Sequence, residues 1–504
     1  MNARELDKNF REKKEQFLSY ISNIKKSMPI DIFSITNVTI INNPYGTNFP
    51  KKFFIEDYKD ENSFFLFIKS SLKFYLKHIY WFFSYIIQFV IYKLFYKKRV
   101  TNENAIFIDI FFLVDNIIKN KKFDENYFSG LYEVLDKYSQ KYIFLPRLYR
   151  VGKNPFKLIS FFKIINRDKK SFLFEFEFLS LKDFIDIFIM IIYYPFKTLR
   201  LKQKENMRVD KLFNIELIRD IQNQQFEAFS RYIYGKNMAK LDKVIKIYSW
   251  SEFQVVERSF NYGIRVNNRD IHLYGCQFYL NYESYFNTFV YDVDFLHQSS
   301  FHKILVNGHI YILNREYIDY KAGVSLRYKN IFNYNISLKG TKILLLGSYI
   351  EKDTKFMLDA VSNFESIFFK NHPVVNIDKF GKLDSNIKIV DNSIYELFEN
   401  TAIVISTASG SAVEAVSCGI SVIIVASQDN LTANPLIDKG KGKIWDIAFS
   451  KDDVEKVYNK LLNYRKNSEE ITKIALWYRE NFFIAPTEEN IIEVFELNEN
   501  GECA

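Results

Sequence analysis

Residues 402–425 read AIVISTASGSAVEAVSCGISVIIV. Two aliphatic runs, 402–406 and 421–427, enclose small and hydroxyl residues, and Gly419 ends the helical pattern of 411–418. Aliphatic runs of this length, separated by a short helix, are typical of buried parallel strands joined by a crossover. The stretch therefore predicts a strand-helix-strand unit with a corner of small residues at the end of its first strand.

The same alternation continues upstream of this unit. Strand patterns at 342–348, 366–373 and 386–392 alternate with helical patterns at 353–364 and 393–401. Short aliphatic strands, each followed by a helix, indicate a doubly wound parallel sheet.

The first half of the chain also alternates between strands and helices. Strand patterns occur at 105–114, 141–146, 243–250, 269–279 and 302–308, with helical patterns at 125–138 and 251–265. We therefore expect an α/β protein in which two Rossmann-like domains face a cleft, with an aromatic basic helical segment inserted or appended in the N-terminal half.

Three local patterns carry further expectations. Residues 33–41 (FSITNVTII) look like a strand. Phe occupies every second position of 171–179, with Glu175 and Glu177 between, and this alternation is typical of a half-buried strand. Ser180 and Asp183 form a helix-start box before an apolar helix that Pro195 is expected to stop, and core burial is favoured over membrane contact for that helix.

Composition places the chain among globular proteins. Its 504 residues are 48% hydrophobic and 26% charged, which suits two or three domains. Three scattered cysteines (Cys276, Cys418 and Cys503) are too few for a disulfide framework or a zinc site, which favours a reducing compartment. The charged N-terminus lacks the apolar core of a signal peptide, so we expect a cytoplasmic protein. The net charge of +9 suits acidic partners.

A basic aromatic segment, at about 64–99, concentrates this charge. No acidic residue occurs from Asn62 to Asn102, and residues 78–92 carry no formal charge. Three placements stay open: a helix in the interface of an anionic membrane, a helix buried in the protein, or, least favoured, a transmembrane span, which needs about 20 apolar residues. A nucleic-acid partner is disfavoured because the basic residues surround an apolar stretch. These residues are Lys69, Lys73, Lys77, Lys93, Lys97, Lys98 and Arg99.

The corner after 402–406 has the composition of a phosphate site. Ligands of open parallel sheets bind where strands end and helices begin. The hydroxyls that can donate to phosphate oxygens are those of Ser406, Thr407, Ser409 and Ser411. Small residues such as Gly410 allow a close approach. The alternative, an ordinary turn in which Ser411 caps the helix and Glu414 returns to its backbone, stays open on these residues alone.

A second polar corner, Lys370-Asn371-His372-Pro373, ends a strand on the same predicted edge. Facing a serine-rich helix start, Lys370 and His372 are interpreted as phosphate ligands, and His372 as a donor that offsets leaving-group charge. Pro373 stiffens the loop. A third strand ends in the small-residue turn Gly347-Ser348, which is too short for a G-x-G-x-x-G or Walker loop.

Together, KNHP at 370–373 and STASGSAVEAVSCGISVIIV at 406–425 resemble the C-terminal domain of nucleotide-sugar-dependent glycosyltransferases of the GT-B type. The resemblance is to the bacterial surface-carbohydrate and sialyltransferase-like groups, and it extends over about 245–450. It implies that the donor nucleotide is gripped by His372, Ser406, Thr407, Ser409 and Glu414. The residues themselves add, as nucleotide-binding candidates, Lys370, Pro373, Gly347, Ser348, Gly410 and Ser411.

Enzymes of this type need no metal, so no metal or other cofactor is expected. The triplet Asp292-Val-Asp294, which could bind Mn²⁺ in the other glycosyltransferase fold, is interpreted as a chance occurrence. Inverting transfer requires a general base on the opposing domain. Glu252 ranks first because it lies at a strand-to-helix edge, ahead of Glu257 and of Asp109, whose alternative role is a satisfied core carboxylate. For Glu252 the alternative is a carboxylate that stabilises a helix dipole.

The resemblance implies transfer of a sugar from a nucleotide-sugar donor to a lipid-linked or surface-polysaccharide acceptor, as in lipopolysaccharide, O-antigen or capsule synthesis. The donor leans towards a CMP-activated sugar, such as a nonulosonic acid or Kdo, with UDP open. The alternatives are a nucleotide-sugar epimerase of the same fold and a non-catalytic membrane-attached assembly protein. The expected parts are an N-terminal region with a membrane-associating helix, an acceptor domain, a nucleotide-sugar domain, and a C-terminal helix and tail, at 1–104, 105–335, 336–480 and 481–504. The protein would be peripheral on the inner face of the cytoplasmic membrane.

Overall fold

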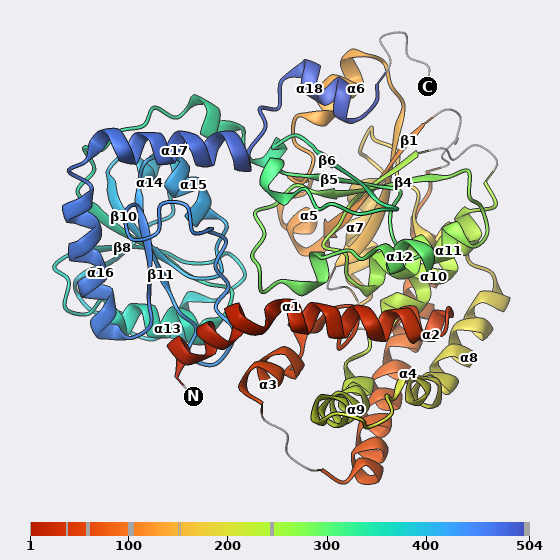
Figure 1. The fold of residues 1–504 in the computed structure, drawn as a ribbon. Helices are drawn as coiled ribbons and strands as arrows, with labels where there is room; N and C mark the ends of the chain where they lie inside the picture. Colours follow the sequence, from red (N-terminus) through yellow and green to blue (C-terminus); the bar gives the residue numbers. More distant parts are fainter. Residues whose placement is uncertain are drawn as a thin grey trace.

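Two parallel sheets organise the chain. The computed structural model describes residues 2–36, 39–56, 61–98, 105–149, 151, 153–241 and 246–497. Within them lie two six-stranded sheets, each packed between helices (Figure 1). Every pairing between neighbouring strands is parallel. The predicted α/β fold with two Rossmann-like domains is therefore confirmed, whereas Arg99, Cys503 and the start of the strand expected at 243–250 lie outside the described residues.

The first sheet has the strand order β2-β1-β3-β4-β5-β6. Its strands are β1 Ile106–Leu113, β2 Tyr142–Tyr149, β3 Lys246–Trp250, β4 His272–Gln277, β5 Lys303–Val306 and β6 Asp319–Ala322. Its helices are α5 Val114–Asn120, α6 Leu131–Lys137, α7 Lys157–Ile165, α8 Leu181–Thr198, α9 Arg208–Asp220, α10 Phe226–Met238, α11 Val255–Arg265 and α12 Asp292–Leu296. Because parallel strands need crossover connections, helices lie on both sides of the sheet, and α8 and α9 pack outside them against α10 and α4.

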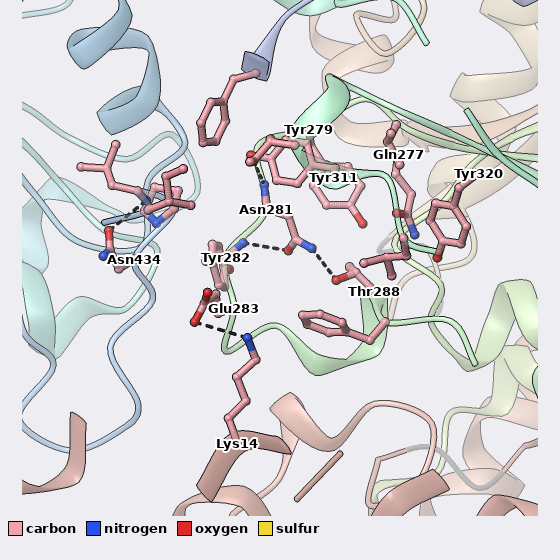
Figure 2. A pocket seen from close by; sticks show the side chains of 18 residues that line it. Lys14, Gln277, Tyr279, Asn281, Tyr282, Glu283, Thr288, Tyr311, Tyr320 and Asn434 are labelled. Atoms are coloured by element: carbon pink, nitrogen blue, oxygen red, sulfur yellow. Dashed lines mark hydrogen bonds and ion pairs between the residues drawn. The ribbon is translucent and has the colours of Figure 1, made fainter. Parts of the chain in front are cut away.

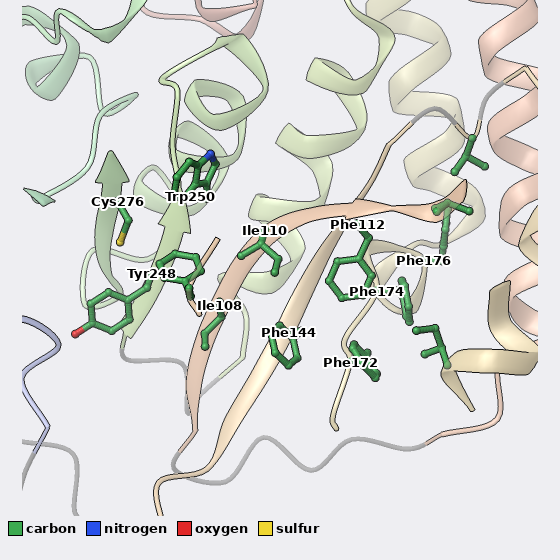
Figure 3. Packing of buried hydrophobic residues seen from close by; sticks show 14 of the residues in the cluster. Ile108, Ile110, Phe112, Phe144, Phe172, Phe174, Phe176, Tyr248, Trp250 and Cys276 are labelled. Carbon is green, nitrogen blue, oxygen red and sulfur yellow. The ribbon is translucent and has the colours of Figure 1, made fainter. Parts of the chain in front are cut away.

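Aromatic side chains fill the core on one face of this sheet (Figure 3). Alternate residues of β1 (Ile108, Ile110 and Phe112) point to the same face, as the two-residue period of a strand requires. The rings of Phe144 on β2 and Phe172 stack with their centroids 5.5 Å apart.

The alternating segment 171–179 is not a strand, contrary to the prediction. Only Phe172 forms a bridge, to Phe144, and Glu175–Phe178 is a short 3-10 helix. The alternation still marks which side chains are buried, but the rings pack against Tyr92 and Tyr96 instead of a neighbouring strand.

Two other local predictions are wrong. Within the strand expected at 33–41, the helix α2 Ile32–Ile35 occupies the first residues. The helix α8 begins with the expected box of Ser180 and Asp183 but continues past Pro195 to Thr198. Pro195 removes the hydrogen bond to the Ile191 carbonyl, but the helix continues for three more residues.

The second sheet has the order β12-β11-β10-β7-β8-β9. Its strands are β7 Lys342–Leu346, β8 Ile367–Lys370, β9 Ile387–Ile389, β10 Thr401–Ser406, β11 Ser421–Val425 and β12 Trp445–Ala448. Its helices are α13 Glu351–Ala360, α14 Ile394–Phe398, α15 Ser411–Ser417, α16 Lys451–Tyr464 and α17 Ser468–Phe482. The strands predicted between 342 and 427 are all present; the sequence missed β12, and in the first sheet β6, which have four residues each.

The N-terminal helix α1 (Ala3–Ser27) runs across both domains (Figure 1). At its amino end Arg4 forms an ion pair with Asp453 of α16, at 2.9 Å. Near its carboxyl end Lys25 is buried against Asp294 of α12, at 2.7 Å. The helix therefore ties the first residues of the chain to both sheets.

The chain returns to the first domain after the second sheet. After α17, the helix α18 (Glu488–Val494) packs against α6, where Lys137 contacts Glu488 at 2.6 Å. The side-chain amide of Asn307 donates to the carbonyl of Phe482 at 2.8 Å. A Cβ at Gly308 would lie 2.3 Å from the Phe482 backbone, so the Asn-Gly turn after β5 allows this close crossing.

The basic aromatic segment forms the helix α4 (Ser63–Phe95), preceded by the short helix α3 (Phe49–Ile55). One side of α4 packs on α7, α8 and α9, and the other is exposed. Among the described residues, no helix has both the length and the apolarity needed to cross a bilayer.

Candidate functional site

The corner between β10 and α15 contains two buried hydroxyls. Ser406 and Thr407 are at most 1% exposed, and neither hydroxyl has a hydrogen-bond partner among the described residues. Ala408 follows in the left-handed region, at φ 49°, which costs energy for a residue with a Cβ. A buried hydroxyl without a partner costs about 1–3 kcal/mol, so both hydroxyls would gain from an additional donor or acceptor.

His372 lies on the same edge of the sheet. The register pairs Ile405 with Leu345, and Leu346 with Lys370, so the ends of β10, β7 and β8 form one row. With about 4.8 Å between neighbouring strands, β10 and β8 lie about 10 Å apart. Between them is Gly347, where a Cβ would stand 3.0 Å from the backbone nitrogen of His372.

The His372 ring is held by its own loop. Its Nδ1 faces the Val374 backbone N–H at 3.3 Å, which leaves Nε2 as the nitrogen that carries the proton. Burial lowers the pKa of His372, so the ring is neutral at neutral pH. A neutral imidazole with Nε2–H can donate to an anionic oxygen.

The other residues of the two corners that are predicted to bind phosphate have local partners. Lys370 donates to the carbonyls of Asp391 and Asn392, and the Ser348 hydroxyl accepts from the Ile350 N–H. Pro373 is exposed. Lys370 and Ser348 therefore hold the loops around His372, and their side chains are engaged within the second domain.

The start of α15 differs from the capping box that the sequence left open as an alternative. Gly410 is the N-cap and Ser411 the first helical residue. Glu414 accepts from the Tyr395 hydroxyl at 2.6 Å and from Ser411 at 3.2 Å, and burial raises its pKa. Ser409 is half-buried. A Cβ at Gly410 would lie 3.1 Å from Leu280 of the first domain, so the two domains meet at this corner.

Glu252 occupies the matching corner of the first sheet, after β3. Its carboxylate accepts from the Tyr285 hydroxyl at 2.8 Å and from the Gln254 amide at 2.7 Å. The next residue, Phe253, is buried in the left-handed region at φ 52°, where a bulky residue is rarely found. Strained corners therefore occur at a strand end in both domains, beside Glu252 and beside Thr407.

Glu257 and Asp109 are buried and paired with arginines. Glu257 accepts from Arg147 at 2.6 Å, and Asp109 pairs with Arg147 at 3.3 Å and with Arg231 at 2.9 Å. Both carboxylates have no exposed side-chain surface. They form a buried charge network with Arg147 and Arg231 that holds β1, β2, α10 and α11 together.

Tyrosines connect Glu252 with His372. The hydroxyls of Tyr45 and Tyr282 both contact that of Tyr349, the latter at 3.3 Å. The Tyr45 ring lies 5.0 Å from that of Tyr285, which donates to Glu252. On the other side, the rings of Tyr349 and His372 are 6.2 Å apart. These four tyrosines come from the N-terminal segment and from both domains, and we call them the tyrosine cluster.

Two cavities flank the tyrosine cluster. A cavity of about 170 Å³ lies between the ends of β4 and β5 and the segment 434–437 of the second domain (Figure 2). Gln277, Tyr279 and Asn281 line it on the first-domain side, and Tyr282 forms part of its wall. A larger cavity of about 500 Å³ is lined by Tyr45, Tyr349 and the end of α9. The cleft between the domains therefore has a chamber on each side of the cluster.

Arg327 adds a positive charge to the junction between the domains. It belongs to the 3-10 helix Leu326–Asn333, which connects the two sheets, and its side chain is exposed. The guanidinium lies 5.3 Å from the Trp250 ring centre and lowers the pKa of Glu414 against the effect of burial. No described carboxylate is within ion-pair distance of it. A cation in such a place can neutralise a phosphate.

Asp292 and Asp294 are occupied by protein groups. Asp294 is buried between Lys25 and Arg258, and Asp292 accepts from the N–H groups of Glu316 and Tyr317. Within the described residues, no three His, Cys, Asp or Glu side chains are grouped as metal ligands.

The tyrosine cluster and Arg327 were missed from the sequence. Tyr45 stands in the turn NNPYG, and Tyr282 and Tyr285 in the polar run NYESYF, where each reads as a loop residue. The spacing of Tyr-x-x-Tyr was the one local signal that two of them could face the same way.

Comparison with known proteins yields distant structural matches. No protein-family model and no curated protein matches the sequence. The UDP-GlcNAc 2-epimerase of Methanocaldococcus jannaschii, solved with UDP-GlcNAc and UDP, is 12% identical, with a TM-score of 0.43 over 78% of this chain and 100% of its own. MurG of Acinetobacter baumannii is 10% identical, with a TM-score of 0.40 over 78% and 100%. The calicheamicin glycosyltransferase CalG4 is 9% identical, with a TM-score of 0.38 over 78% and 99%. None of these matches assigns a role to a residue of this chain.

Proposed function

We propose that the protein is a glycosyltransferase of the GT-B type, which moves a sugar from a nucleotide-sugar donor to a hydroxyl acceptor. One observation carries the proposal: the carboxylate of Glu252 and the neutral ring of His372 follow strands of opposite sheets, and the tyrosine cluster connects them. A general base on one domain and a leaving-group donor on the other are the two groups that inverting transfer requires.

The second domain would bind the donor nucleotide. The unpaired hydroxyls of Ser406 and Thr407, the Nε2–H of His372 and the guanidinium of Arg327 are all suited to phosphate oxygens. Ser409 and Gly410 border the same corner. These donors replace the role that a metal ion has in other transferases, so the proposal includes no metal.

The first domain would bind the acceptor and activate it. Glu252 takes the proton of the acceptor hydroxyl, whose oxygen forms a bond to the anomeric carbon of the sugar. The bond between that carbon and the phosphate oxygen breaks, and its electron pair leaves with the nucleotide. Because the acceptor approaches from the domain opposite the phosphate, the anomeric configuration is inverted. Tyr285 holds the Glu252 carboxylate in place through its hydroxyl.

The finer assignment rests on the resemblance of the two loops. A His-Pro beside a Ser/Thr-rich corner favours a CMP-activated donor, such as a nonulosonic acid or Kdo, over a UDP-sugar. A glycan acceptor carried on a lipid would suit the exposed apolar helices of the first domain.

A nucleotide panel tests the proposal. CMP, CDP, UDP and GDP are added to the wild type, to His372→Ala and to Arg327→Ala, and the melting temperature is recorded. We expect one nucleotide to stabilise the wild type and to lose most of its effect in both variants. His272→Ala is the matched control, because His272 begins β4 at the opposite edge of the first sheet.

Three results would count against the proposal. Equal stabilisation of the wild type and His372→Ala removes this residue from the site. Failure of all four nucleotides to stabilise the wild type favours a non-catalytic assembly protein. Release of an altered free sugar without any acceptor favours an epimerase.

A further inference from the structure

The helices α4 and α8 lie side by side on the outside of the first domain (Figure 1). The Tyr75 hydroxyl of α4 donates to the Ile192 carbonyl of α8 at 2.8 Å. The rings of Phe82 and Phe188 are 5.4 Å apart. The two helices therefore present a common outer surface, here called the α4/α8 face.

The α4/α8 face is apolar. Five residues of α4 that share one side of the helix are between 46% and 67% exposed: Leu72, Leu76, Phe83, Val90 and Leu94. On α8 the exposure is between 51% and 81% for Leu181, Ile185, Tyr193 and Phe196. The expectation that α8 is buried in the core is therefore wrong for its outer half.

The buried side of α4 carries polar residues in addition to Phe74, Tyr85, Ile91 and Tyr92. Ser70, His78, Ser84 and Gln88 are buried, and His78 bonds to Gln224 at 2.6 Å. A surface helix of a globular protein normally places its apolar residues inward and its polar residues outward. In α4 large apolar side chains cover the outer side, so that side requires an apolar environment of its own.

Positive charges border the face. On α4, Lys69, Lys73 and Lys93 are exposed, and α4 contains no carboxylate. The two acidic residues of α8 are engaged, Asp183 at the Ser180 cap and Asp186 with Lys236 at 3.8 Å. An apolar stripe with lysines beside it and no free carboxylate complements an anionic lipid surface.

We propose that the α4/α8 face lies on an anionic lipid bilayer, with both helices parallel to the membrane plane. With 33 residues, α4 is about 50 Å long, so its apolar side chains would enter the interface along a line. The proposal holds for binding alone and does not depend on the chemistry of the cleft.

The position of the face also connects with the cleft. Lys77 of α4 donates to the Gln224 carbonyl at 2.8 Å, next to Gln222 and Asn223, which line the larger cavity. One short segment thus separates the bilayer side from that cavity. Resting on the proposed function, this arrangement would bring a lipid-linked acceptor to the cleft from the membrane.

Vesicle sedimentation tests the proposal. The full chain is mixed with vesicles of phosphatidylglycerol and phosphatidylcholine, or of phosphatidylcholine alone. We expect the wild type to bind the anionic vesicles and Leu72→Glu/Leu76→Glu to bind at least 10-fold more weakly. The matched control is Ile389→Glu/Leu476→Glu, which adds the same charge at exposed apolar positions of the second domain and should bind like the wild type.

The lysines give an independent arm. Lys69→Gln/Lys73→Gln should weaken binding to anionic vesicles about 30-fold, because each lysine near the surface contributes about 1 kcal/mol, and should leave binding to neutral vesicles unchanged.

Wild-type protein that stays in the supernatant at low salt overturns the proposal. Equal vesicle binding by the two glutamate variants also overturns it. A third contrary result is a wild-type dimer that does not bind vesicles and that the substitutions Leu72→Glu/Leu76→Glu dissociate. Nucleotide stabilisation of Leu72→Glu/Leu76→Glu should match the wild type, which separates this test from that of the proposed function.

Discussion

Asp294 provides the sharpest test of how α1 is attached to the first domain. Its carboxylate lies between two cations, Lys25 at 2.7 Å and Arg258 at 2.6 Å, and all three side chains are at most 2% exposed. The substitution Asp294→Asn would leave the Arg258 guanidinium buried without a counter-charge and would remove the carboxylate partner of Lys25, whose pKa burial lowers to about 7. Breaking a buried ion pair by removing one partner costs about 3–5 kcal/mol, and we expect that loss of unfolding free energy.

The matched variant is Lys25→Met. It replaces one cation by an apolar chain of similar length and leaves Arg258 paired with Asp294. Replacing a buried charge in this way is often close to neutral, so we expect a loss below about 1.5 kcal/mol. Each variant differs from the wild type by one charge. The difference between their losses of unfolding free energy therefore reports whether a buried charge is left unpaired.

Acid adds a second signature. Burial alone would raise the pKa of Asp294, but Arg258 and Lys25 lower it from 3.8 to about 2. Because the folded pKa is depressed, this stabilisation is present above pH 4 and is lost as the pH falls towards 2, and it amounts to about 2–3 kcal/mol. The variant Asp294→Asn should lack this part of the acid sensitivity.

Urea unfolding, followed by circular dichroism at pH 7 and pH 3, measures all of these changes. A loss of less than 1 kcal/mol in Asp294→Asn, or equal losses in the two variants, would refute the reasoning. The result also bears on the site, because the Arg258 guanidinium stacks 3.6 Å from the ring centre of Phe253, next to Glu252.

Two further predictions concern the cleft and its surroundings. Glu252→Gln keeps the size of the side chain and an acceptor for the Tyr285 hydroxyl but cannot take a proton. It should therefore lower kcat by about 10²–10⁴ with little change in KM, measured once an acceptor substrate has been found. An unchanged kcat would exclude Glu252 as the general base. Asp220 is buried, which raises its pKa from 3.8 to about 6, so folding takes up a proton between these values and stability falls as the pH rises through them. Asp220→Asn should therefore gain up to about 3 kcal/mol over the wild type at pH 8 and less at pH 5 in urea unfolding, and a loss at pH 8 would show that the charge itself is needed.

The central strands of the second sheet, β7, β10 and β11, were predictable because they are aliphatic on both faces. In 402–425 the residue types alone distinguish strand, corner and helix, and parallel topology then places His372 on the same edge as Ser406. The segment 171–179 shows the limit of this approach. Alternation reports which side chains are buried, and burial against the tyrosines of α4 produces the same pattern as burial in a sheet.

The cleft was only partly predictable, because its contacts join distant parts of the chain. Tyr45 contacts Tyr282 and Tyr349, which lie more than two hundred residues away in the sequence, and no local pattern predicts these contacts. Glu257 had a suitable residue type and lies near a strand end, but its burial depends on Arg147 from another strand. The partner of a charged residue in a parallel sheet is set by register, which the sequence does not display.

The central claim is that His372 and the hydroxyls after β10 bind one anion of a nucleotide. A double-mutant cycle tests it most directly: titration calorimetry gives the Kd of the stabilising nucleotide for the wild type, His372→Ala, Ser406→Ala and the double variant. If both groups contact one phosphate, the free-energy changes should deviate from additivity by about 0.5–3 kcal/mol. Additive changes, or a Kd that neither substitution alters, would contradict the claim.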